Sequence, residues 1–216
     1  AMSYVVEYVG MDLGLDGMAV QATGDGDSFA EAVKAVLETA EVPLMLIADD
    51  PDVMAKGVEV AKEARPLMYG ATADSWEGFA DLAKEYDVPM AVRADTMSGL
   101  AELTQKVQDA GVKDIVLDPI VRDMHSALVL NTLVRRKAID ETFRPLGFPT
   151  VSFPGEIGDD EGMVTIAAVQ AIAKYSGFIV LDQFKPEVVY PLLALRTNIY
   201  TDPQEPIQVE PGVYEI

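Results

Sequence analysis

Short apolar runs alternate with amphipathic segments along almost the whole chain, and this alternation limits the possible folds more than any other feature. The apolar runs are continuous instead of alternating, as expected for parallel strands that are covered on both faces. They predict seven strands, near residues 16–22, 43–48, 66–70, 88–92, 114–118, 149–153 and 177–181.

The segments between these runs predict helices. The first three have start signals: Ser28 to Glu31 and Asp74 to Glu77 have the spacing of a capping box, and Asp50-Pro51 reads as an N-cap followed by a proline in the first turn. Later helices are expected at 97–110, about 124–141, about 160–174 and about 186–195.

Strands that alternate regularly with helices predict an α/β fold with a parallel sheet. The repeat length suits a TIM-type (β/α)8 barrel, although only seven units can be counted. We therefore expect a barrel that lacks or modifies its first βα unit, with residues 4–9 as a substitute strand or the end of a helix. A doubly wound sheet is the alternative, but no glycine-rich phosphate loop opens any of the expected helices.

Composition excludes several classes of partner and cofactor. The formal charge of −20 repels nucleic acid and anionic lipid surfaces. The chain has no cysteine, so it can hold neither a thiolate-ligated iron–sulfur cluster nor a thiolate zinc site. No apolar run approaches the roughly 18 residues of a membrane span, and no signal peptide is visible, so a cytoplasmic location is expected.

Several segments resemble one protein family. The proline-rich stretch 197–216 resembles the segment that joins the barrel to the cobalamin domain in the large (gamma) subunit of the corrinoid iron–sulfur protein of the acetyl-CoA decarbonylase/synthase system. Four further segments are similar and follow in the same order: 42–51, 65–77, 116–119 and 143–149.

The resemblance implies that residues 1–196 are the central TIM-type barrel of a methyl carrier and that 197–216 are a linker toward an absent cobalamin domain. It implies cobalamin and a 4Fe–4S cluster in flanking domains, with no cofactor held by this stretch. The carrier would pass a methyl group from a methyltetrahydropterin to acetyl-CoA synthase. Its expected partners are the small subunit of the corrinoid protein, in a heterodimer, the methyltetrahydropterin methyltransferase and acetyl-CoA synthase. The isolated chain would be colourless and without methyl-transfer activity.

In a TIM-type barrel, functional residues lie at the carboxyl ends of the strands. The polar residues expected there are Asp49, Asp50, Thr72, Asp74, Arg93, Asp95, Asp118, Ser152, Glu156 and Asp182. Asp118-Pro119 resembles the Asp-Pro turn of pterin-binding methyltransferase barrels, which makes Asp49, Asp95 and Asp118 candidate ligands of a pterin. The alternative is that Asp50 and Asp74 are helix N-caps and that Asp118 caps its own turn.

Two other features have both a functional and a structural interpretation. His125, the only histidine, could be a general base or a polar surface residue near the start of a helix. The basic cluster Arg135–Lys137, followed by Arg144, could be a docking patch in an acidic chain or could balance charge near a helix C-terminus. No catalytic residue can be named. A sugar-phosphate barrel enzyme is disfavoured because no glycine-rich phosphate turn lies near the last strands.

Overall fold

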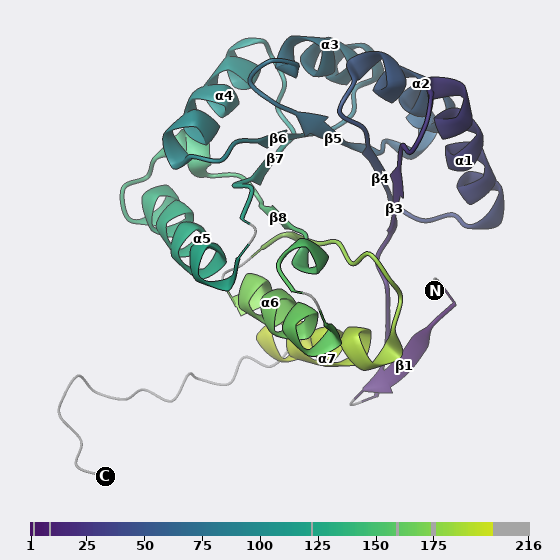
Figure 1. Ribbon diagram of the computed structural model, residues 1–216, viewed down its shortest axis with the longest axis vertical. Coiled ribbons are helices and arrows are strands. Elements are labelled where there is room, and N and C mark those ends of the chain that lie inside the picture. The colour runs from purple at the N-terminus through teal and green to yellow at the C-terminus, as the bar shows by residue number, and fades with distance from the viewer. Residues whose placement is uncertain (2, 9, 122, 159, 174–175, 201–216) are drawn as a thin grey trace.

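Seven parallel strands and seven helices alternate along the chain, with the helices forming an outer ring around the strands (Figure 1). The computed structural model describes residues 1–200 except 2, 9, 122, 159, 174 and 175. The strands are β3 (Met18–Gln21), β4 (Leu44–Ile47), β5 (Leu67–Ala71), β6 (Met90–Arg93), β7 (Ile115–Asp118), β8 (Val151–Ser152) and β9 (Phe178–Ile179). The helices are α1 (Gly26–Thr39), α2 (Pro51–Ala61), α3 (Trp76–Tyr86), α4 (Met97–Asp109), α5 (Met124–Ile139), α6 (Glu161–Ala173) and α7 (Pro186–Tyr200).

The strands follow one another around the wall in chain order. β3 to β7 form one parallel sheet, and β8 pairs with β9 in a second. The two are joined where Leu117 N–H donates to the carbonyl of Pro149 at 2.8 Å and Leu117 bridges to Thr150. Among the described residues no ladder joins β9 back to β3, so the wall is open at that seam. The predicted TIM-type architecture with seven units is confirmed.

An antiparallel hairpin precedes the seven units. It consists of β1 (Val5–Tyr8) and β2 (Met11–Gly14), which resolves the open question about residues 4–9 in favour of a strand. Leu13 of the hairpin packs in one cluster with Val189 and Leu193 of α7. The hairpin therefore covers the last helix and does not supply the missing parallel strand.

Two apolar layers hold the wall in place. The larger layer lies between the sheet and the helices and includes Met54 on α2, Met68 on β5 and Met90 on β6, all fully buried. Each such side chain contributes about 1.5–3 kcal/mol by leaving water. The second layer fills the inside of the wall, and its members come from five strands or the residues just after them: Met45, Leu67, Tyr69, Ala91, Val116, Val151 and Phe153.

The structure corrects two of the predicted helix starts. The N-cap of α1 is Asp25 rather than Ser28, because the Asp25 carboxylate accepts the backbone N–H of Ser28 at 2.9 Å. The N-cap of α3 is Ser75, whose side chain makes no capping bond, so Asp74 is not a cap. Asp50 caps α2 as predicted, by accepting from Asp52 N–H at 2.8 Å.

Two further observations concern the predicted ends and spans. α7 continues to Tyr200, beyond its predicted end near 195, whereas most of the predicted linker, 201–216, lies outside the described residues. Within the part of the chain that the structure describes, we find no helix with the length and apolar character needed to cross a bilayer.

Candidate functional site

A buried tyrosine and a buried carboxylate meet at the carboxyl ends of the central strands. The hydroxyl of Tyr69 on β5 donates to Oδ2 of Asp118 on β7 at 2.5 Å. Tyr69 is 4% exposed and Asp118 is 1% exposed, so the bond is shielded from water. Both side chains point to the inside of the barrel, because alternate residues of a strand face the same side of the sheet.

The second oxygen of the Asp118 carboxylate is also used. Oδ1 accepts the backbone N–H of Ile120 at 2.8 Å, so the residue caps its own turn, as the alternative interpretation predicted. Ile120 has a positive φ of 48°, which is uncommon for a β-branched residue. The carboxylate thus fixes the chain reversal after β7 and anchors Tyr69 at the same time.

An arginine extends this group toward solvent. Arg93, the last residue of β6, donates to Oδ1 of Asp49 at 2.7 Å, and its guanidinium lies 5.7 Å from the centre of the Tyr69 ring. The Tyr69 ring also packs against Phe153, with centroids 4.8 Å apart. Asp49, Arg93, Tyr69 and Asp118 therefore form one continuous chain of interactions, which we call the strand-end network.

Electrostatics define what this network can do chemically. Burial, reinforced by the charge of Asp118, raises the pKa of Tyr69 well above its usual value. The tyrosine therefore remains a protonated donor at neutral pH and is unsuited to act as a base. The buried acceptor of the network is the Asp118 carboxylate, so any group that replaced Tyr69 there would have to be a hydrogen-bond donor.

The structure brings together two of the three candidate pterin ligands. Asp49 and Asp118 both belong to the strand-end network, Asp49 through its bond with Arg93 and Asp118 through its bond with Tyr69. Asp95 is exposed in the loop that precedes α4 and is not a member of the network. Tyr69 was missed, since a tyrosine within a continuous apolar run shows no sign of which way it points.

The other polar residues predicted at strand ends have local structural roles or face solvent. Thr72 and Ser75 bond to each other, with their hydroxyl oxygens 3.2 Å apart. The hydroxyls of Ser152 and Ser176 are likewise 3.2 Å apart. Asp74, Glu156 and Asp182 are exposed.

The remaining candidates lie on or near α5 and are not members of the strand-end network. His125 is exposed in the first turn of this helix, behind the N-cap Asp123. Arg135 and Arg136 are exposed in the last turns, and Lys137 pairs with Glu141 at 2.5 Å. In the described ranges no three His, Cys, Asp or Glu side chains are grouped so that they could hold a metal ion.

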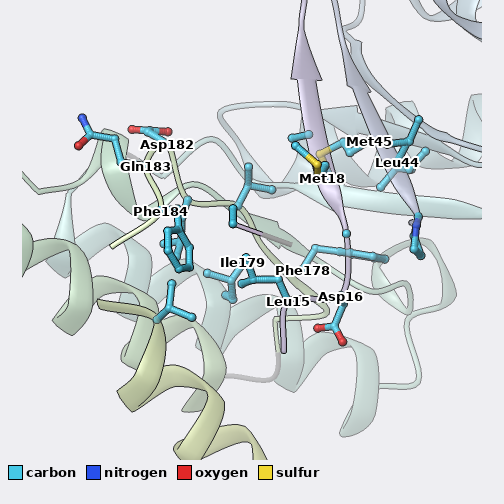
Figure 2. Close-up of a pocket in the computed structure, with 18 of the residues that line it drawn as sticks. Leu15, Asp16, Met18, Leu44, Met45, Phe178, Ile179, Asp182, Gln183 and Phe184 are labelled. Carbon is cyan, nitrogen blue, oxygen red and sulfur yellow. The ribbon is translucent and has the colours of Figure 1, made fainter. Parts of the chain in front are cut away.

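A cavity of about 600 Å³ lies at the open seam, at the other end of several strands. Figure 2 shows Met18, Leu44 and Met45 on one side of it and Phe178, Ile179 and Phe184 on the other. Its lining is mainly apolar, and it includes neither Tyr69 nor Asp118. The cavity follows from the missing ladder between β3 and β9, so we assign the site to the strand-end network instead.

A family model described as "CO dehydrogenase/acetyl-CoA synthase delta subunit" matches residues 1–216. The chain is 36% identical over 210 residues to the "Corrinoid/iron-sulfur protein large subunit" of Moorella thermoacetica, covering 96% of this chain and 46% of that protein. It is 38% identical over 227 residues to the "Acetyl-CoA decarbonylase/synthase complex subunit gamma" of Archaeoglobus fulgidus, covering 100% of this chain and 48% of that protein. The chain thus spans about half the length of these relatives.

Similar solved structures include dihydropteroate synthases. The enzyme from Vibrio fischeri superposes with a TM-score of 0.64 at 15% identity, over 89% of this chain and 84% of that one. The enzyme from Thermus thermophilus gives 0.61 at 16% identity, over 86% and 81%. At this level of identity the similarity concerns the fold alone, and the fold is that of a TIM-type barrel.

Proposed function

The chain belongs to the CO dehydrogenase/acetyl-CoA synthase delta subunit family, and we propose that it is the barrel scaffold of a corrinoid iron–sulfur methyl carrier. The carrier accepts a methyl group from a methyltetrahydropterin and delivers it to acetyl-CoA synthase. This barrel positions the corrinoid domain and contacts the small subunit of the carrier in a heterodimer. The methyltransferase and acetyl-CoA synthase are its further partners, and the complex works in the cytoplasm.

The observation that carries this proposal is the identity of 36–38% with large and gamma subunits over at least 96% of this chain. The family description names a delta subunit, whereas these relatives are called large or gamma subunits. We follow the relatives, because they are matched as individual proteins along nearly the whole chain.

The donor set of the chain fits a scaffold without its own cluster. A 4Fe–4S cluster in such a carrier is held by four thiolates, and this chain has no cysteine. We therefore assign the cluster to another part of the carrier, and we propose that the corrinoid is held by a further domain. The corrinoid would supply the cobalt atom that bears the methyl group.

The strand-end network supports a structural role for this end of the barrel. The carboxylate of Asp118 is bound by Tyr69 and by its own turn, and the carboxylate of Asp49 is bound by Arg93. Polar groups that are satisfied within the protein stiffen a fold and are not free to change partners at low cost. The network therefore holds the ends of β5, β6 and β7 in fixed positions relative to one another.

A barrel exchange tests the proposal. In the Moorella large subunit, the matching segment is replaced by residues 1–200 of this chain. The purified chimera is then combined with the Moorella small subunit under anaerobic conditions. We expect the chimera to retain corrinoid and to accept a methyl group from methyltetrahydrofolate with the methyltransferase. In parallel, residues 1–216 alone are incubated with cob(II)alamin and desalted. A stoichiometric corrinoid spectrum on that isolated chain would contradict the proposal.

A second function is favoured by one observation, the buried carboxylate of Asp118 beside the Arg93–Asp49 pair. A pterin could replace Tyr69 as the donor to this carboxylate, which would make the barrel a pterin-binding methyltransferase. Isothermal titration calorimetry with methyltetrahydrofolate distinguishes the scaffold from the pterin-binding methyltransferase. Saturable binding that is lost in Asp118→Asn and kept in Asp95→Asn would favour the pterin site. No binding at millimolar ligand favours the scaffold.

A further inference from the structure

Helices α5 and α6 are apolar on their outer faces, unlike the helices α1 to α4 of the ring. Large apolar side chains that are at least 38% exposed occur at six positions on these two helices: Leu128, Val129, Leu133, Ile139, Met163 and Ile166. On the described residues of α1 to α4 there is one, Val60. Helices in contact with water normally have a polar outer face, so an apolar one marks a surface that another molecule covers.

Two of the exposed apolar side chains on α5 form a stripe along one face of the helix. Val129 and Leu133 are four residues apart, and Arg136 follows three residues later, so the three lie on one face of the helix. Val129 and Leu133 are each 40% exposed, and Ile166 on the neighbouring α6 is 53% exposed. α5 and α6 pack side by side (Figure 1). We call this surface the α5–α6 face.

Charge distinguishes the α5–α6 face from the rest of the chain. α5 contains Arg135, Arg136 and Lys137 and no carboxylate, whereas each of the other helices α1–α4, α6 and α7 contains at least one carboxylate. The full sequence has a net charge of −20. Because Lys137 pairs with Glu141 and Arg136 lies on the face of the stripe, we take Arg136 as its cationic rim. Such a rim beside an apolar stripe is complementary to a partner surface that has an apolar ridge edged with Asp and Glu.

We infer that the α5–α6 face is the docking surface for a companion subunit with an acidic, apolar contact surface. The identity of that companion, the small subunit of the carrier, rests on the proposed function. A second copy of this chain fits less well, because two chains of −20 repel each other. An anionic membrane is disfavoured by the same net charge.

The face extends along both helices and onto the loop that follows α5. α5 is 16 residues long, which corresponds to about 24 Å of helix, and α6 is 13 residues long. The loop after α5 adds Phe143, which is 41% exposed, and Arg144. A stable complex takes roughly 800 Å² from each partner, so we expect the contact to use both helices and this loop.

The test measures binding of the whole chain to the small subunit by calorimetry and gel filtration. Leu133→Glu removes the centre of the stripe, and Arg136→Glu reverses the rim. Matched controls make the same changes on other helices: Val60→Glu on α2 and Lys34→Glu on α1. All four positions are exposed, so circular dichroism and thermal unfolding should show intact folds.

We expect Leu133→Glu to weaken binding about 10- to 100-fold, as for a central interface residue. Arg136→Glu should weaken it about tenfold and reduce its salt dependence. Both controls should bind like the wild type. Equal binding by all variants would show that the α5–α6 face is not the docking surface, while leaving the proposed function in place. Failure of the wild-type chain to bind would instead contradict the proposed partner and remove the inference with it.

Two further measurements examine the other possible occupants. Sedimentation of the wild-type chain alone should show a monomer. A dimer that Leu133→Glu dissociates would assign the face to a second copy and overturn the inference. Flotation with phosphatidylglycerol vesicles should leave the chain in solution. Vesicle binding that Arg136→Glu abolishes would likewise overturn it.

Discussion

Tyr69 on β5 reaches past β6 to donate a hydrogen bond to Asp118 on β7, 49 residues further along the chain. In TIM-type barrels the inward side chains of alternate strands meet in layers. Here one such layer includes a polar pair as well as apolar residues. The bond therefore ties two non-neighbouring strands together across the inside of the wall.

Removing the hydroxyl should destabilise the protein. Tyr69→Phe leaves a buried oxygen of Asp118 without its donor, which costs about 1–3 kcal/mol of unfolding free energy. Urea unfolding followed by circular dichroism measures the loss. Tyr190→Phe is the control, because Tyr190 is 43% exposed and should be neutral. Equal stability of the two variants would show that the Tyr69–Asp118 bond contributes nothing.

The same tyrosine should make the protein sensitive to alkali. Burial raises the pKa of Tyr69 in the folded state, whereas in the unfolded chain it is about 10. Above pH 10 the unfolded chain therefore releases a proton that the folded chain keeps, and stability falls as the pH rises. The loss approaches about 1.4 kcal/mol per pH unit for one proton. Unfolding free energies between about pH 9 and 11 should fall more steeply in the wild type than in Tyr69→Phe, and parallel curves would refute the assignment.

The ion pair between Arg93 and Asp49 should contribute less to the unfolding free energy than the Arg93 side chain does as a whole. The Asp49 side chain is 78% exposed, and that of Arg93 is 23% exposed. Asp49→Asn should cost less than about 1 kcal/mol, as for most exposed ion pairs. Arg93→Ala should cost about 1–2 kcal/mol, because the guanidinium also lies over the Tyr69 ring. A double-mutant cycle gives the coupling, and a value well above about 1 kcal/mol would show that the pair is more than a surface contact.

Gly70 should be the least replaceable glycine of the wall. It sits at a register shift in β5 with φ +149°, and a Cβ there would lie 1.8 Å from the carbonyl oxygen of Ala48. Gly70→Ala should cost about 3 kcal/mol or more, from backbone strain and overpacking together. Gly111 isolates the backbone effect, because its φ is +97° but a Cβ would meet nothing within 4 Å. Gly111→Ala should cost about 1–2 kcal/mol, and a similar value for Gly70→Ala would argue against the clash.

The sequence was sufficient to predict the order and approximate bounds of the seven strands and helices. The spacing of apolar residues and the residues that start and stop helices are local properties of the sequence. For example, α2 begins at Pro51, as the Asp50-Pro51 signal predicts. The helix starts were less certain, because Asp25 and Ser28 can both cap and only the three-dimensional structure selects one.

Two members of the strand-end network were among the residues named from the sequence, and pterin binding by them stays a prediction. Asp49 and Asp118 were named because functional residues of a TIM-type barrel lie at the carboxyl ends of strands, and because Asp118-Pro119 resembles the Asp-Pro turn of pterin-binding barrels. Tyr69 could not be found in this way, since strands covered on both faces have no polar alternation to show which residues point inward. The apolar outer face of α5 was also missed, because a helix with apolar residues on both sides looks like an ordinary core helix in the sequence.

The fully buried methionines Met54, Met68 and Met90 have a consequence for chemical reactivity. A thioether reacts with peroxide only when the oxidant can reach the sulfur, and these three sulfurs are closed off by the sheet and the helices. Their conversion to sulfoxide must therefore wait until the protein opens around them. In dilute peroxide, the rate at which each of them gains one oxygen atom, followed by mass spectrometry, would report how often that part of the wall comes apart.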